Sequence, residues 1–129
     1  MIENLYAFYD GDCGLCTAAR RWFNGQTQLV PVLFLPYQSE RARRLCPRLP
    51  DLHPDREIVV LADNGEVYQG DSAWITLLWA TASWRSLSVD LSSPGMRRMI
   101  RPVIEAISDN RLTLSRWLGL RAKSAVGCE

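Results

Sequence analysis

Apolar and polar positions along this 129-residue chain change their period several times, and each period predicts an element of secondary structure. Residues 4–9 are aromatic-rich and alternate loosely, which predicts a first strand. The run from Cys13 to Phe23 has helical spacing and is followed by an Asn-Gly stop signal. The mostly apolar residues 29–35 predict a buried second strand. The chain therefore begins in the order strand, helix, strand.

The middle of the chain predicts a short helix and a hairpin. Ser39 is a typical N-cap for a helix over residues 40–45, which should end before a proline. Residues 47–55 are then expected to form a loop. Two apolar runs, residues 57–61 and 66–69, are joined by an Asn-Gly turn, which is among the strongest signals of a β-hairpin.

The last part of the chain predicts helices. The longest apolar stretch, residues 73–84, is about half a bilayer span and predicts a buried helix, so no membrane span is expected. A later helix should carry its apolar side chains on one face and be kinked or restarted by Pro102. That face comprises Met96, Met99, Ile100, Val103, Ile104 and Ile107. A short helix is expected over residues 113–118, and residues 121–129 have the composition of a flexible tail.

This order of elements is typical of a thioredoxin-like arrangement. We therefore expect an α/β fold, with a central sheet of about four strands flanked by helices and with extra helices at the C-terminal end. Residues 1–120 should form one domain. The chain length and the 47% share of hydrophobic residues suit a single domain with one sizeable core.

Charge and the N-terminus narrow the class of protein. Fifteen basic and fourteen acidic residues nearly cancel, so nothing indicates a nucleic-acid partner. The first residues lack the basic and long apolar regions of a signal peptide, which predicts a cytoplasmic protein. Because the cytoplasm is reducing, the four cysteines of the protein should rest mostly as thiols. Redox chemistry or metal binding is therefore more plausible than structural disulfides.

Cys13 and Cys16 stand at the predicted start of a helix, so their side chains share one face and can close a small disulfide. Unpaired N–H groups and the helix dipole favour a thiolate at Cys13, which is predicted to attack a substrate disulfide. Cys16, one turn inside and facing the core, is predicted to resolve the mixed disulfide. Asp12 is expected to cap the helix, and Asp10 to relay a proton to Cys16 or to bond its own backbone.

Two other readings of the cysteines stay open. A structural pair would simply pack the helix against the sheet. A zinc site would need Cys46 and His53 in addition to Cys13 and Cys16, with a spacing wider than is usual, so no resident metal is expected. Cys46 is otherwise a core or loop thiol, and Cys128 an incidental surface thiol of the tail.

The run from Tyr9 to Cys16, YDGDCGLC, closely resembles the opening signature of the DCC family of predicted thiol-disulfide oxidoreductases, named for its Asp-Cys-Cys pattern. Further blocks that resemble this family cover nearly the whole chain: Pro36-Tyr37-Gln38-Ser39, residues 58–68, Gly70-Asp71-Ser72-Ala73, Asn110-Arg111 and Arg116-Trp117. The resemblance implies exchange with a protein or small-molecule disulfide, without a bound cofactor and with an electron donor yet to be identified.

Resemblance to thioredoxins themselves is looser. Aligning the hairpin turns puts Glu57 where thioredoxins carry a cis-proline that faces the active-site disulfide, and Pro54 lies three residues too early. An acidic side chain beside Cys13 would also disfavour its thiolate.

The competing hypothesis is a noncatalytic binding module. Trp74, Trp79, Trp84 and the basic C-terminal helices would then contact a partner, with the cysteines structural or zinc-bound. The three tryptophans are spaced five apart and do not line one helix face, so core packing is the simpler expectation.

Overall fold

The computed structural model describes residues 2–119, and the structural statements below concern that part of the chain. The predicted tail and Cys128 lie outside it. The elements in chain order are β1 (Leu5–Tyr9), α1 (Gly14–Asn24), β2 (Val32–Pro36), α2 (Glu40–Leu45), the 3-10 helix η1 (Leu49–Leu52), β3 (Val59–Ala62), β4 (Val67–Gln69), α3 (Asp71–Trp79), α4 (Arg85–Leu91), α5 (Pro94–Asp109) and α6 (Arg111–Trp117).

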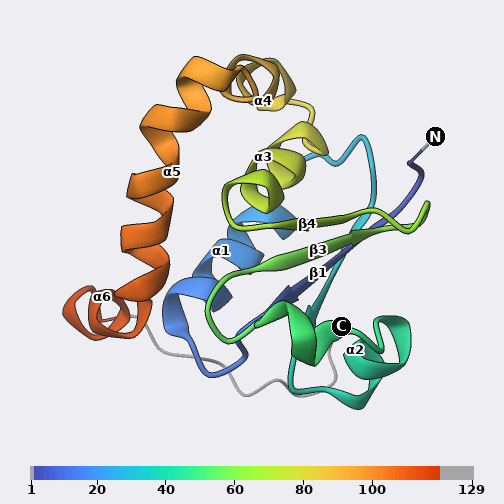
Figure 1. Cartoon of the computed structure of the whole chain (residues 1–129), viewed down its shortest axis with the longest axis vertical. Helices are drawn as coiled ribbons and strands as arrows, with labels where there is room; N and C mark the ends of the chain where they lie inside the picture. The colour runs from blue at the N-terminus through green and yellow to red at the C-terminus, as the bar shows by residue number, and fades with distance from the viewer. Residues whose placement is uncertain (1, 120–129) are drawn as a thin grey trace.

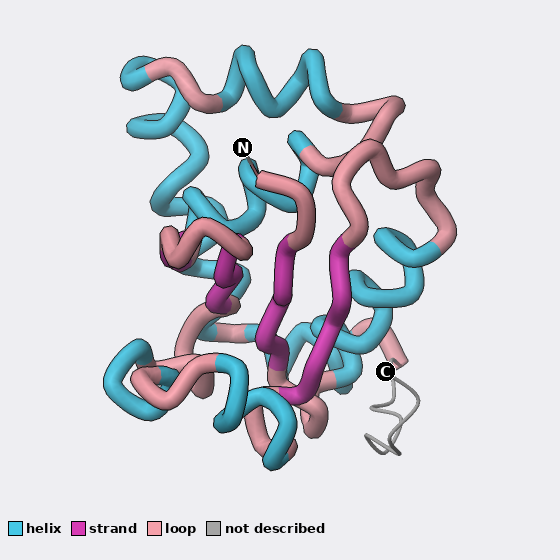
Figure 2. The backbone as a smooth tube through the Cα atoms, turned by 90° about the vertical axis from the view of Figure 1, so that its right-hand side faces the viewer, coloured by secondary structure: helices cyan, strands magenta, loops and turns pink. Residues whose placement is uncertain are grey.

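The four strands form one mixed sheet in the order β2-β1-β3-β4. β1 runs parallel to β2 and antiparallel to β3, and β3 forms an antiparallel hairpin with β4. The helices lie around this sheet, as Figures 1 and 2 show. The observed architecture confirms the expected α/β, thioredoxin-like fold with its four-stranded sheet.

Both faces of the sheet are covered, because alternate side chains of each strand point to opposite sides. Leu5, Ala7 and Tyr9 of β1 belong to a core cluster with Phe23 of α1 and with residues of α3. Phe8, between them, packs in a second cluster with residues of α2 and η1. α1 and α3 therefore form the layer on one face, and the smaller α2 and η1 form the layer on the other.

The C-terminal helices return to the body of the protein. α5 runs along one side of the molecule from α4 to α6, as Figure 1 shows. Asp71, in the first turn of α3, anchors it through ion pairs with Arg97 at 3.2 Å and Arg101 at 3.7 Å. α6 then packs against α1. The last described helix is thereby brought to the helix that carries the cysteines.

Several predicted bounds are confirmed. α2 covers the predicted residues, with Ser39 Oγ accepting a hydrogen bond from the Ala42 N–H at 3.1 Å. The hairpin forms as expected, and its turn needs glycine because Gly65 has a φ of 92°. α1 ends at the predicted Asn-Gly pair, where Gly25 is the C-cap.

Three expectations about bounds are wrong. β2 begins only after Pro31, which has no N–H for the sheet ladder. In the apolar stretch 73–84 the helix ends at Trp79 and a turn follows, because the chain after α3 hydrogen-bonds back to the segment before β2, with Leu29 N–H donating to the Ala80 carbonyl at 2.7 Å. Of the two expected effects of Pro102, the restart is wrong because α5 runs through this residue, and the kink stays a prediction. Pro102 is exposed, so water can reach the carbonyl that loses its helical donor.

No helix among residues 2–119 combines the length and the apolar character needed to cross a bilayer.

Candidate active site

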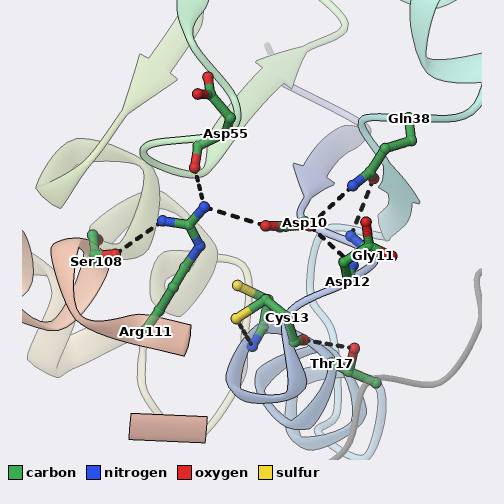
Figure 3. Close-up of polar contacts among 10 residues, drawn as sticks. Asp10, Gly11, Asp12, Cys13, Thr17, Gln38, Asp55, Ser108 and Arg111 are labelled. Carbon is green, nitrogen blue, oxygen red and sulfur yellow. Dashed lines mark hydrogen bonds and ion pairs between the residues drawn. The ribbon is translucent and has the colours of Figure 1, made fainter. Parts of the chain in front are cut away.

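The turn between β1 and α1 places Cys13 at the N-cap of α1. The Cys13 N–H donates to the Asp10 carbonyl at 3.1 Å, and the Cys13 backbone is extended, with φ −101° and ψ 118°. Its Sγ accepts a hydrogen bond from the Cys16 N–H at 3.3 Å, as Figure 3 shows. The expectation that Asp12 caps the helix is therefore wrong: the turn leaves the Asp12 side chain exposed, and the thiol itself takes the cap position.

The two sulfurs differ in exposure. Cys13 is fully buried, at 0% exposure, and its side chain caps the helix. Cys16 is half-buried and lines a cavity. Cys16 packs against the core cluster, as predicted, and its position one turn into α1 also brings it to that cavity.

The electrostatics of the pair favour a proton on Cys16 and a negative charge on Cys13. The pKa of the Cys16 thiol is raised far above its usual range, first by its hydrogen bond to Cys13, then by burial and by negative charge on Cys13. Asp10 raises it further and Arg111 lowers it. The N–H that points at Cys13 Sγ stabilises a negative charge on that sulfur. A pair that has lost one proton therefore keeps the other proton on Cys16.

Asp10 is the centre of a buried hydrogen-bond network that holds the turn. One carboxylate oxygen accepts the Asp12 N–H and the Gln38 side-chain amide, both at 2.9 Å. Gln38 in turn accepts the Gly11 N–H at 3.1 Å. The other carboxylate oxygen lies 3.2 Å from Arg111, as Figure 3 shows. Of the two expectations for Asp10, the bond to its own backbone is confirmed, and a proton relay stays a prediction.

Arg111 is the site residue that the sequence reading missed. It is the first residue of α6, and its guanidinium contacts the carboxylate of Asp10 and the carbonyls of Ser108, at 3.0 Å, and Asp55. One side chain thus joins the cysteine turn, the end of α5 and the loop before β3. The Asn110-Arg111 block, which resembles the family, was the one indication of this residue in the sequence. Its contact with Asp10 could not be predicted, because the two residues are 101 positions apart in the chain.

A cavity of about 310 Å³ opens beside Cys16. Its walls are mainly apolar and come from the sheet, α1, α3 and α5. The apolar lining comprises Tyr9, Leu15, Ala19, Phe34, Pro54, Ile58, Trp74, Ile104 and Ile107. The polar lining comprises Asp10, Arg56, Glu57, Ser108 and Arg111. An apolar cavity with one sulfur of the pair in its wall is an arrangement in which a small sulfur compound can be held beside the cysteines.

Glu57 lines this cavity together with Cys16. The pKa of its carboxyl is raised above the ordinary 4.5, first by burial and then by Glu105, Asp71 and Asp109. All peptide bonds of residues 2–119 are trans, so the segment before β3 differs from the thioredoxin pattern, as the sequence comparison predicted. Pro54 is buried and lines the same cavity.

The residues of the zinc hypothesis are not brought together. Cys46 is buried with Phe8 and Leu35 on the opposite face of the sheet from the Cys16 cluster, and burial raises the pKa of its thiol. His53 is exposed at the end of η1. Within the described residues, no three His, Cys, Asp or Glu side chains form a group that could hold a metal ion. The reading of Cys46 as a core thiol is confirmed.

The tryptophans do not form one shared surface. Trp74 is half-buried, lines the cavity and stacks on Phe23 with ring centroids 6.2 Å apart. Trp79 is also half-buried and lies beneath the Arg85 guanidinium, 4.4 Å from its ring centroid. Trp84 is 38% exposed. Packing therefore accounts for Trp74 and Trp79, as expected.

Comparison with known proteins gives one match over most of the chain. A protein-family model described as DCC1-like thiol-disulfide oxidoreductase matches residues 7–117. This span contains both cysteines of the pair, Asp10 and Arg111. No curated protein and no solved structure matches the chain significantly.

Proposed function

The chain belongs to the DCC1-like thiol-disulfide oxidoreductase family, and from this premise we propose that it reduces a disulfide substrate through Cys13 and Cys16. The Cys13 thiolate attacks one substrate sulfur, which forms a mixed disulfide and releases the first substrate thiol. Cys16 then loses its proton and attacks the Cys13 sulfur, which closes the Cys13–Cys16 disulfide and releases the second thiol. Two electrons pass to the substrate, and an external thiol reductant restores the pair.

The hydrogen bond from the Cys16 N–H to Cys13 Sγ is the observation that best supports these roles. Nucleophilic attack on a disulfide requires the thiolate, and this contact favours negative charge on Cys13. The strongly raised pKa of Cys16 supports the same order of events, because Cys16 keeps its proton until Cys13 has reacted.

The exposure of Cys16 favours a second candidate order, in which Cys16 attacks first. Cys16 lines the cavity, whereas Cys13 is fully buried. We favour attack by Cys13 because a thiol with a strongly raised pKa is almost never ionised at neutral pH. Attack by Cys13 then requires the helix start to open, and we propose that α6 and Arg111 move away during the reaction.

Asp10 is proposed to be a positioning residue. Both of its carboxylate oxygens already accept hydrogen bonds, from the turn, from Gln38 and from Arg111, which leaves it better suited to hold the turn than to relay a proton. Asp12, whose side chain is exposed, has no proposed role in catalysis.

Trapping the mixed disulfide tests the mechanism. In Cys16→Ser, Cys13 can open a substrate disulfide but nothing displaces the substrate afterwards, so a stable adduct should accumulate and be visible by intact-mass spectrometry. Cys13→Ser should form little adduct. Every variant should also carry Cys46→Ala, because that site is apolar, and Cys128→Ser, so that other thiols do not react.

The outcomes separate the alternatives. An adduct that forms on Cys16 in Cys13→Ser, but not on Cys13 in Cys16→Ser, would reverse the two roles. If neither variant forms an adduct and the parent protein reduces no disulfide faster than free dithiothreitol, the enzyme hypothesis fails and the binding-module reading replaces it.

A further inference from the structure

Building on the proposed function, we propose that the cavity beside Cys16 binds a small, neutral and apolar disulfide, best an aromatic one, in preference to a polypeptide or an anionic disulfide. The inference deepens the proposed reaction by assigning its substrate class. It depends on the size of the cavity, its lining, its access and the charges at its rim.

The size and the lining indicate a small apolar molecule. A volume of about 310 Å³ is at the lower end of the range of about 300–1,000 Å³ that is usual for small-molecule sites. Tyr9 and Phe34 contribute aromatic rings in an edge-to-face pair, with centroids 6.4 Å apart, and Trp74 contributes a third. Aromatic side chains in such arrangements favour another aromatic ring as their neighbour.

α5 restricts access for a polypeptide. Ile104 and Ile107 of α5 line the same cavity as Glu57 and Ile58, which precede β3. An extended chain docking along this segment would meet α5, which ion pairs with Asp71 hold in place. A molecule of one or two rings does not need to lie along the segment before β3, because it can enter the cavity itself.

The charges at the rim disfavour an anion. Burial disfavours a negative charge on Glu57, and repulsion from Glu105, Asp71 and Asp109 adds to this effect. The Arg111 guanidinium is already engaged by Asp10. Arg56 adds one positive charge, but it is exposed and therefore screened by solvent. A neutral molecule avoids the repulsion that a carboxylate-bearing disulfide would meet.

The reaction of a disulfide held in this cavity balances as a two-electron exchange once the helix start has opened and Cys13 can reach the substrate. A neutral diaryl disulfide gives one aryl thiol when the mixed disulfide forms and a second when the Cys13–Cys16 disulfide closes. An external dithiol, dithiothreitol in the experiment, reduces the protein again and becomes oxidised itself.

Two aromatic disulfides of similar size but different charge test the specificity. Dithiodipyridine is neutral at neutral pH, whereas dithiobis(nitrobenzoate) carries two carboxylates, and the products of both can be followed by their absorbance. Each enzymatic rate is divided by the rate with dithiothreitol alone, which corrects for intrinsic reactivity. We expect the acceleration to be at least about tenfold larger for the neutral compound. Insulin and glutathione disulfide should be accelerated less than the neutral compound.

A cavity-filling variant and a redox-inert ligand locate the binding site. Ala19→Phe should fill the cavity and weaken binding, whereas Ala106→Phe, on the exposed surface of α5 and outside the cavity lining, is the matched control. Diphenyl sulfide, which has no disulfide bond, should bind the parent protein and Ala106→Phe but bind Ala19→Phe about tenfold more weakly in equilibrium dialysis. Circular dichroism checks that both variants fold.

The two proposals fail in different ways. If diphenyl sulfide binds and Ala19→Phe weakens it, the cavity assignment stands even where no disulfide is reduced, and only the proposed function fails. If disulfides are reduced but the dianionic compound or insulin is accelerated as much as the neutral one, the substrate class is overturned and the exchange reaction stands. Absence of diphenyl sulfide binding to the parent protein would also overturn the substrate class.

Discussion

Replacing Arg111 with methionine tests whether a buried ion pair holds α6 over the cysteine helix. Methionine keeps an apolar stem of similar length and removes the charge and the hydrogen bonds. The side chains of Arg111 and Asp10 are 17% and 10% exposed, so this pair is largely removed from water. The variant leaves the Asp10 carboxylate with only the donors from the turn and from Gln38.

The expected cost follows from the burial of that carboxylate. Removing one partner of a buried ion pair costs about 3–5 kcal/mol, because the remaining charge stays desolvated. Asp10 keeps two donors at 2.9 Å, so we expect the lower end, about 3 kcal/mol of unfolding free energy. With a urea m-value of about 1–3 kcal/mol/M, the unfolding midpoint should fall by roughly 1–3 M.

Urea unfolding of Arg111→Met and three further variants checks this magnitude. Arg116→Met removes an exposed arginine from the same helix, so it is the matched control and should change stability by less than about 0.5 kcal/mol. Asp10→Asn and the double variant Asp10→Asn/Arg111→Met complete a double-mutant cycle, whose coupling energy should be about 1–3 kcal/mol. Equal unfolding midpoints for Arg111→Met and Arg116→Met would refute the reasoning.

The same variant tests what covers Cys13. If α6 and Arg111 limit access to the helix start, Arg111→Met should let iodoacetamide modify Cys13 faster in native buffer, as peptide mapping would report. A destabilised variant in which Cys13 reacts no faster would show that other parts of the fold bury this sulfur.

Two further predictions concern Glu57 and Gly70. The pKa of Glu57 is raised above 4.5 in the folded protein, so its ionisation penalises folding at neutral pH, and this penalty disappears below pH 4.5, where the group is protonated in both states. Glu57→Gln should therefore raise Tm at neutral pH and lose that advantage on acidification, whereas a pH-independent Tm difference would contradict the assignment. Gly70 has a φ of 59°, and a Cβ there would lie 2.6 Å from a Glu57 carboxylate oxygen, so Gly70→Ala should cost about 1–3 kcal/mol in thermal unfolding. Gly95→Ala, where a Cβ meets nothing within 4 Å, should cost nothing, and equal Tm values for the two alanine variants would exclude backbone strain at Gly70.

Features that depend on neighbouring residues could be predicted from the sequence. The hairpin follows from its turn, where the Asn64 side chain accepts the Glu66 N–H at 3.0 Å and Gly65 takes a positive φ. α2 follows from Ser39, whose hydroxyl caps it three residues away. The alternation of β1 likewise sends Phe8 and its neighbours to opposite faces of the sheet.

The cysteine pair and its place at a helix start were also predictable, because a CxxC motif after a strand and a turn is a local pattern. The identity of the capping group was not. Whether Asp12 or Cys13 caps α1 depends on one turn hydrogen bond, from the Cys13 N–H to the Asp10 carbonyl, and both residues are compatible with the local pattern.

Only the tertiary structure decides which sulfur is accessible and what surrounds it. The cavity beside Cys16, which residues of α5 and α6 help to line, and the contact of Arg111 with Asp10 depend on these C-terminal helices folding back, with α6 packed against α1. Periodicity determines which face of a helix is apolar, but it carries no information about where that helix docks. The docking here rests on pairs such as Asp71 with Arg97 and Asp10 with Arg111, which lie 26 and 101 residues apart in the chain. Such contacts exist only once the chain has folded, so the motif predicted the thiol chemistry proposed for the site and the fold decided which sulfur reaches the cavity.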